Sequence, residues 1–110
     1  MITGPAVSVI VPAYQAEDTI DRCLAALAQQ TVPRARYEVL VVDDGSSDGT
    51  PARAQAHAGV RLLRQAHRGP AAARNLGVEQ AQGQIVLFTD ADCEPLPDWI
   101  ERMVAALDGG

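Results

Sequence analysis

Two pairs of aspartates are the groups in this sequence whose type and spacing could bind a cation. Asp43-Asp44 and Asp90-Ala91-Asp92 each directly follow, or nearly follow, a run of apolar residues. Because alternate residues of an extended chain point the same way, Asp90 and Asp92 can face one ligand. Crowded carboxylates repel one another unless a cation lies among them, and hard oxygen ligands favour Mg²⁺ or Mn²⁺ over Zn²⁺. A turn that caps a helix would equally explain Asp43-Asp44 alone, so the metal hypothesis needs both pairs together.

The aspartates would be positioned by short apolar segments that alternate with amphipathic ones. Strands are predicted over 7–11, 37–42, 60–63 and 85–88, and helices over 16–30, 50–58, 70–82 and 97–107. Pro12 has no N–H to donate to a sheet and is predicted to end the first strand. The βαβαβαβα order predicts an α/β fold, a three-layer α/β/α domain with a mainly parallel sheet. Ligands of such sheets bind beyond the carboxyl ends of the strands, where both aspartate pairs are expected.

The composition excludes several classes of function. The chain has 110 residues, 47% of them hydrophobic and 21% charged, which is typical of a single globular domain. Its net charge of −5 disfavours a nucleic-acid partner. All nine basic residues are arginine, so a P-loop lysine and a Schiff-base lysine are excluded. Cys23 and Cys93 are expected to be reduced thiols, and a cytoplasmic protein is expected, with peripheral membrane contact left open.

Four segments, in this order, resemble family 2 glycosyltransferases of the GT-A fold. They are residues 7–14 (VSVIVPAY), 41–50 (VVDDGSSDGT), 69–77 (GPAAARNLG) and 88–92 (FTDAD), and with their spacing they extend over most of the chain. The resemblance implies the Rossmann-like, nucleotide-binding half of a GT-A fold. It also implies transfer of a sugar from a nucleoside-diphosphate sugar to an acceptor, which the sequence leaves open as a saccharide, a lipid or a protein. A divalent cation, Mg²⁺ or Mn²⁺, would bridge the diphosphate.

The resemblance places the nucleotide base beside the first two strands. Pro12 and Tyr14 match positions that line the base, and a tyrosine at a strand end offers the flat face that stacking needs. The acid that matches Asp44 accepts a hydrogen bond from a base N–H, and Glu17 lies where an acid can approach the base or the ribose. Gln15 departs from the family pattern, which commonly has asparagine there, but it keeps an amide.

The resemblance places the ribose and the diphosphate at the other end of the site. The position that matches Asp90 approaches the ribose, and the one that matches Asp92 binds the metal. Arg74, near the start of the third predicted helix, is placed for contact with the base or a phosphate. His67 and Arg68 could border the diphosphate by position alone, although a solvated surface histidine is the better interpretation of His67.

A full transferase of this type continues beyond this length with an acceptor-binding half and an acidic general base. Residues 1–110 are therefore expected to be a donor-binding half, truncated at the C-terminus, that binds a donor without turnover and contains no catalytic residue. The alternative is a non-catalytic nucleotide-binding or self-associating module, because an incomplete sheet exposes an edge that can form a homodimer. A dinucleotide-binding oxidoreductase is disfavoured, since Pro-Ala-Tyr-Gln-Ala follows the first strand instead of Gly-x-Gly-x-x-Gly.

Overall fold

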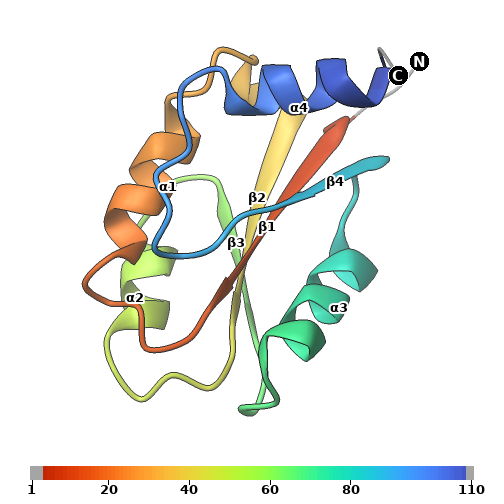
Figure 1. The fold of residues 1–110 in the computed structure, drawn as a ribbon. Coiled ribbons are helices and arrows are strands. Elements are labelled where there is room, and N and C mark those ends of the chain that lie inside the picture. Colours follow the sequence, from red (N-terminus) through yellow and green to blue (C-terminus); the bar gives the residue numbers. More distant parts are fainter. Residues whose placement is uncertain (1–3, 109–110) are drawn as a thin grey trace.

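The centre of the structure, a computed structural model that describes residues 4–108, is a parallel sheet of four strands (Figure 1). The strands are β1 (Val7–Ala13), β2 (Tyr37–Asp43), β3 (Val60–Arg64) and β4 (Ile85–Phe88), in the spatial order β3-β2-β1-β4. The helices are α1 (Ile20–Ala28), α2 (Thr50–Gln55), α3 (Pro70–Gln80) and α4 (Trp99–Asp108), with a 3₁₀ turn at Arg34–Arg36. The predicted α/β class, the order of elements and the parallel sheet are confirmed.

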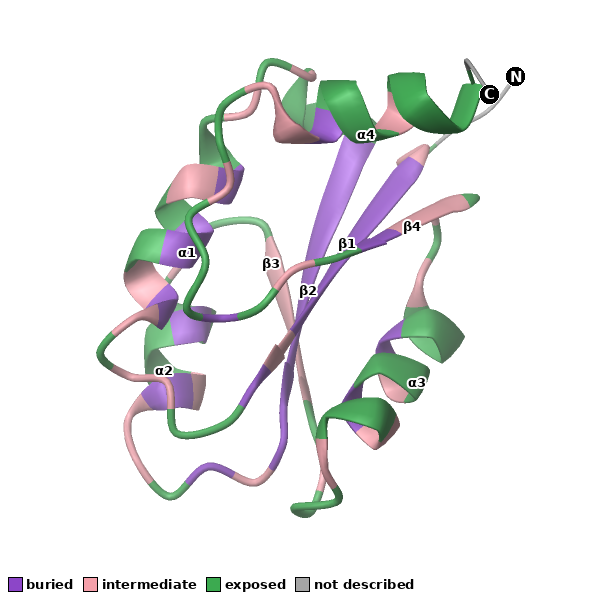
Figure 2. Ribbon diagram, viewed as in Figure 1, coloured by how far each residue is buried: buried purple, intermediate pink, exposed green. Residues whose placement is uncertain are grey.

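Helices cover both faces of the sheet, which gives the structure three layers. One face packs against α1, α2 and α4, and the other packs against α3 through Ala73. Side chains of a strand alternate between faces, so Val9 and Val11 belong to the first core while Ile10 belongs to the second. Figure 2 shows the two central strands, β1 and β2, buried along most of their length. Burial on both faces explains why these strands are almost continuous apolar runs in the sequence.

Helix α3 lies close to the sheet because it presents small residues to it. Its buried residues are Ala73 and Gly77. A Cβ atom built on Gly77 would lie 2.5 Å from Cγ2 of Ile10, far inside van der Waals contact. Position 77 therefore has room only for glycine at this distance between helix and sheet, and a larger residue would move α3 away.

Pro12 does not end the first strand, and this corrects the prediction from the sequence. β1 continues through Pro12 to Ala13. The carbonyl of Ile10 accepts an N–H from the segment after β4, whereas the carbonyl of Ala13 accepts one from the end of β2. The backbone of Pro12 points toward β4, as the backbone of Ile10 does, because alternate residues of a strand point to the same neighbour. β4 has already ended at Phe88 before it could pair with Pro12. The missing N–H of Pro12 therefore costs the sheet no hydrogen bond.

The helices are shorter than predicted. α1 begins at Ile20 instead of residue 16, and α4 begins at Trp99 instead of residue 97. Before α1, the N–H groups of Gln15, Ala16 and Glu17 are bonded to side chains of Ser46, Thr50 and Asp48, and Gln15 has a left-handed backbone that lies outside a helix. Within residues 4–108, no helix has the length and apolar character needed to cross a membrane.

β3 and β4 are the two edges of the sheet. β4 is short, and Phe88 at its end is 44% exposed. An open edge offers backbone groups to another strand. The structure thus contains the edge on which the predicted homodimer depends, whereas dimerisation itself stays a prediction that light scattering of the concentrated chain would test.

Candidate functional site

The carboxyl ends of the strands surround a hollow of about 200 Å³ at one rim of the sheet. Segments that follow β1, β2, β3 and β4 all contribute to it, as expected for the binding side of a parallel sheet. Its lining residues are Pro12, Ala13, Tyr14, Asp44, His67, Pro70 and Asp90. The structure therefore brings four of the predicted site residues together: Pro12, Tyr14, Asp44 and Asp90.

The carboxylate of Asp44 is buried beside this hollow and is engaged by hydrogen bonds. Oδ1 accepts the backbone N–H of Arg68 at 2.7 Å and the side-chain amide of Gln65 at 2.8 Å, and Oδ2 accepts the N–H of Gly69 at 3.0 Å. Burial opposes ionisation, but these donors and the nearby imidazole outweigh it and hold the pKa of Asp44 below its ordinary value. Asp44 thus fixes the loop over residues 65–69 as an ionised carboxylate.

His67 is the residue of this rim to which the sequence analysis gave too little weight. Its ring stacks on Tyr14, with centroids 4.2 Å apart and planes inclined by 26°. Its Nδ1 lies 2.9 Å from Oδ2 of Asp44. One signal was present in the sequence, because His67 follows the third strand and so had to lie near the same rim. Its joint contact with Tyr14 and Asp44 depends on the folded chain.

The loop before α1 and the loop after β2 are joined by several hydrogen bonds. Ser47 N–H donates to Oε1 of Gln15 at 2.6 Å, and the N–H of Gln15 donates to Oγ of Ser46 at 2.9 Å. Oε2 of Glu17 accepts the N–H of Gly49 at 2.8 Å. Gln15 adopts a φ of 51°, a left-handed conformation that is uncommon outside glycine. These contacts hold the segment that carries Tyr14 against the segment that carries Asp44.

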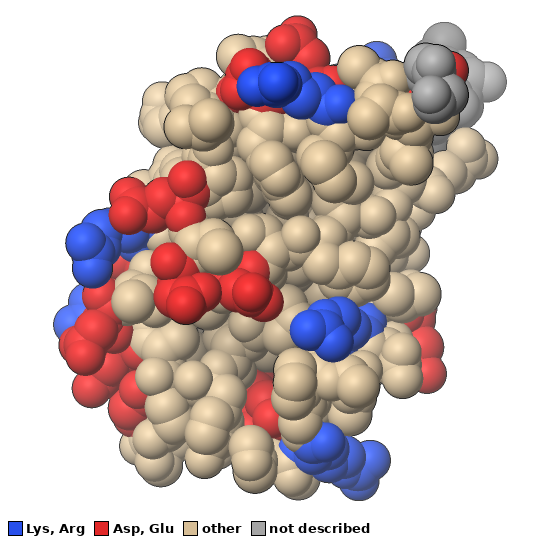
Figure 3. All heavy atoms as spheres, in the orientation of Figure 1, with Lys and Arg blue, Asp and Glu red and all other residues tan. Residues whose placement is uncertain are grey.

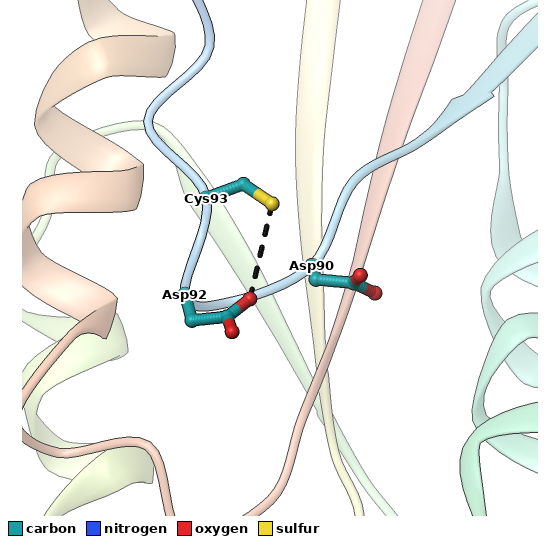
Figure 4. Close-up of side chains that lie close together, drawn as sticks. All are labelled: Asp90, Asp92 and Cys93. Carbon is teal, nitrogen blue, oxygen red and sulfur yellow. Dashed lines mark hydrogen bonds between the residues drawn. The ribbon is translucent and has the colours of Figure 1, made fainter.

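Asp90, Asp92 and Cys93 form an exposed cluster on the loop after β4 (Figure 4). One ligand atom from each lies within 4.8 Å of the others, and Sγ of Cys93 is 3.8 Å from Oδ1 of Asp92. Among residues 4–108, neither carboxylate has an ion-pair partner. Two adjacent carboxylates suit Mg²⁺ or Mn²⁺, ions that keep several waters and share phosphate oxygens. The two carboxylates therefore fit the predicted cation, whereas the thiol of Cys93, which points toward Asp92, is a soft ligand that Mg²⁺ and Mn²⁺ do not prefer.

The family of this chain is decided by its similarity to known proteins. The family model described as Glycosyl transferase family 2 matches residues 8–110. The chain belongs to this family. The resemblance drawn from the four sequence segments, including the GT-A fold, is thereby confirmed.

Named relatives of this family 2 chain are glycosyltransferases. AglE of Haloferax volcanii is 44% identical over 97% of this chain and 37% of its own length. Staphylococcus aureus TarS in complex with UDP superposes with a TM-score of 0.86 at 33% identity, over 94% of this chain and 32% of that one. The mannosyltransferase PcManGT from Pyrobaculum calidifontis, in complex with GDP-Man and Mn²⁺, gives 0.74 at 40% identity, over 81% of this chain and 28% of that one. The chain spans about a third of AglE, of the solved 1–349 portion of TarS and of PcManGT, and 16% of whole TarS.

Three predicted residues of the family 2 chain do not line the hollow. Asp92 lies in the neighbouring cluster, and Glu17 holds the loop at Gly49. Arg74 is exposed on α3 and forms no ion pair with any residue that the structure describes. Figure 3 shows acidic side chains over the middle of this face and basic ones beside them, over the region of α3. An anion bound here would therefore meet carboxylates on one side and arginine on the other.

Cys23 supports the loop that carries the acidic cluster. Its Sγ is buried under that loop and donates to the carbonyl of Asp90 at 3.5 Å. Burial raises the pKa of Cys23 to about 12, so the thiol stays protonated and can donate. Cys93 is exposed, and both cysteines are free.

Proposed function

We propose that residues 1–110 bind the nucleoside diphosphate of a nucleotide sugar and act as the donor-binding portion of a family 2 glycosyltransferase. The observation that carries this proposal is the hollow itself, in which an aromatic ring, a buried carboxylate and an exposed carboxylate meet from segments after three different strands. Solved relatives support it, because they hold UDP, UDP-GlcNAc or GDP-Man.

The base of the nucleotide is proposed to lie against Pro12 and Tyr14. Tyr14 is 50% exposed and lines the hollow, and an exposed tyrosine can offer its ring for stacking. Asp44 belongs to the same end of the hollow and keeps its predicted role in base recognition. Because its oxygens are already bonded to the loop over residues 65–69, a base N–H can reach them only in competition with those donors. The predicted contact of Glu17 with the base or the ribose stays a prediction.

The ribose and the diphosphate are proposed to lie toward the cluster after β4. Asp90 lines the hollow and is proposed to contact the ribose, whereas Asp92 would hold the divalent cation together with the neighbouring side chains. A bound cation would neutralise charge on the diphosphate and stabilise it as a leaving group. Arg74 is proposed to contact the base or a phosphate, for which its exposed guanidinium is suited.

We propose sugar transfer to a saccharide, lipid or protein acceptor for a protein of the relatives' full length. We do not propose it for residues 1–110 alone. These residues correspond to well under half of each relative's length. Their site contains groups for binding a nucleotide and a cation, and we assign no catalytic base among them. We expect this portion to bind the donor without transferring the sugar.

Calorimetry of the chain with UDP, GDP and dTDP, each with and without Mn²⁺, tests the proposal. Binding of at least one nucleotide that strengthens with Mn²⁺ is expected, and Asp92→Asn should remove the effect of the metal. Glu79→Gln is a matched control, because it removes one exposed carboxylate of α3 outside the site. If circular dichroism shows that the chain is folded and it binds none of the three nucleotides, the proposal is wrong.

A further inference from the structure

The rings of Tyr14 and His67 form a stacked pair at the rim of the hollow, although 53 residues separate them in the sequence. Their centroids are 4.2 Å apart, which leaves no space for a third ring between them. The imidazole therefore covers one side of Tyr14. Tyr14 is still 50% exposed and lines the hollow, so part of its surface is available to a ligand.

Asp44 holds the imidazole in this place. Nδ1 of His67 lies 2.9 Å from Oδ2 of Asp44 and 3.1 Å from its carbonyl oxygen. Together with the bonds from Gln65, Arg68 and Gly69 to the carboxylate, this contact ties the imidazole and the loop over residues 65–69 to Asp44. Asp44 thus positions the imidazole and the loop, and a base N–H would reach its carboxylate only in competition with these donors.

The backbone of His67 also packs closely against Gly45. Gly45 has a φ of 78°, and a Cβ atom built on it would lie 2.7 Å from the backbone nitrogen of His67. The two segments therefore touch backbone to backbone, which only glycine allows. The position of the imidazole follows from the packing of two loops as well as from the rotamer of one side chain.

We propose that His67 is a positioning residue for the nucleotide base: anchored by Asp44, it holds Tyr14 in the orientation in which the other side of the ring stacks on the base. This inference rests on the proposed function of the hollow. A ring that is already fixed loses less conformational entropy when a ligand binds. His67 should therefore raise the affinity for the base, which stacks on this ring. The diphosphate, which the acidic cluster and its cation would bind, should gain nothing from His67.

Three substitutions separate the two contacts of His67. His67→Phe keeps a ring for Tyr14 and loses the bond to Asp44, His67→Asn keeps a donor and loses the ring, and His67→Ala loses both. His57→Ala is the matched control, because the other histidine bonds to Asp21 outside the hollow. For each variant, calorimetry measures the affinity for UDP with Mn²⁺ and for Mn²⁺-pyrophosphate, a ligand without a base.

His67→Ala is expected to weaken UDP binding roughly tenfold, from lost preorganisation of one aromatic side chain, and to leave the affinity for pyrophosphate unchanged. His67→Phe should bind UDP more tightly than His67→Ala, and His57→Ala should match the wild type. The ratio of the two affinities is the readout, since a general loss of structure would reduce both. Thermal unfolding checks that each variant is folded.

Equal or tighter UDP binding by His67→Ala, or an equal loss of pyrophosphate affinity, would overturn the role of His67. If His67→Ala does not fold, the comparison of the other two variants decides: better UDP binding by His67→Phe than by His67→Asn supports the role, and the reverse overturns it. A folded wild-type chain that binds none of UDP, GDP and dTDP would overturn the proposed function, and this inference with it. Tight binding that no His67 variant changes would overturn the inference alone.

Discussion

Asp44 follows β2, and Asp90 and Asp92 follow β4 at the same rim, yet the protein treats their carboxylates in opposite ways. Asp44 is buried and bonded to a loop, whereas Asp90 and Asp92 are exposed and have no ion-pair partner among the described residues. A buried carboxylate is tolerated only when donors satisfy it, whereas exposed carboxylates are satisfied by water until a cation replaces it. One half of the site is therefore organised by the protein itself, and the other half is completed by what it binds.

The largest expected effect comes from removing the buried carboxylate. Asp44→Ala leaves the N–H groups of Arg68 and Gly69 without their acceptor, and the free energy of unfolding should fall by about 3 kcal/mol. Urea denaturation followed by circular dichroism measures this change, with Glu79→Gln as the control that should stay within about 0.5 kcal/mol. A stability of Asp44→Ala equal to that of the control would show that the two halves of the site do not differ in this way.

Substitutions in the exposed half of the site should change the affinity for ligands and leave the free energy of unfolding nearly unchanged. Asp92→Asn is expected to weaken Mn²⁺-dependent UDP binding roughly a hundredfold, about 2.8 kcal/mol, through loss of a metal ligand. Without metal, the same variant should unfold within about 0.5 kcal/mol of the wild type. A large loss of stability in metal-free buffer would contradict the view that this carboxylate is kept for a ligand.

Acid should act on the buried half through the pKa of Asp44. This pKa is lowered in the folded state from 3.8, because the hydrogen bonds to the carboxylate outweigh its burial. The contribution of Asp44 to stability is therefore present above pH 3.8 and is lost as the pH falls through the lower, folded-state pKa. Urea denaturation at a series of pH values between neutral and 3 should show this decline, and Asp44→Asn should have a shallower profile. Identical profiles for the two proteins would contradict the assignment.

The smallest effect is expected at Gln15, whose contacts join the loops of the organised half. Gln15→Ala should lower the free energy of unfolding by about 1 kcal/mol, because it loses the bond to Ser47 and keeps the left-handed backbone. Gln15→Asn should lose less, since asparagine adopts positive φ more readily. Chemical denaturation of the two variants side by side compares them, and a less stable Asn variant would count against this explanation.

Features that depend on residues close together in the sequence were predictable from the sequence. The apolar runs of β1 and β2 indicated buried parallel strands, and the residues after each strand indicated the binding rim. Pro12 was interpreted wrongly because the effect of a missing N–H depends on which neighbouring strand it faces. That direction follows from the register of β1 and β4, which local sequence does not reveal.

Contacts between distant segments were the part of the site that sequence reasoning missed. Tyr14 and His67 are brought together by loops after β1 and β3, and β2 lies between these two strands in the sheet. Likewise, the bond between Glu17 and Gly49 keeps residues 15–17 from joining α1, although their composition permits a helix. Such pairings depend on packing across the sheet, where propensity and periodicity carry no information.

The close approach of Gly77 to Ile10 has a consequence for protein engineering. One absent side chain sets the height of α3 above the sheet, and α3 carries Arg74 and follows directly on the loop that holds His67. Mutant libraries meant to change donor preference should therefore keep position 77 constant and vary residues 65–68. Substitution at 77 would displace several recognition groups at once, whereas changes in the loop would alter them one at a time.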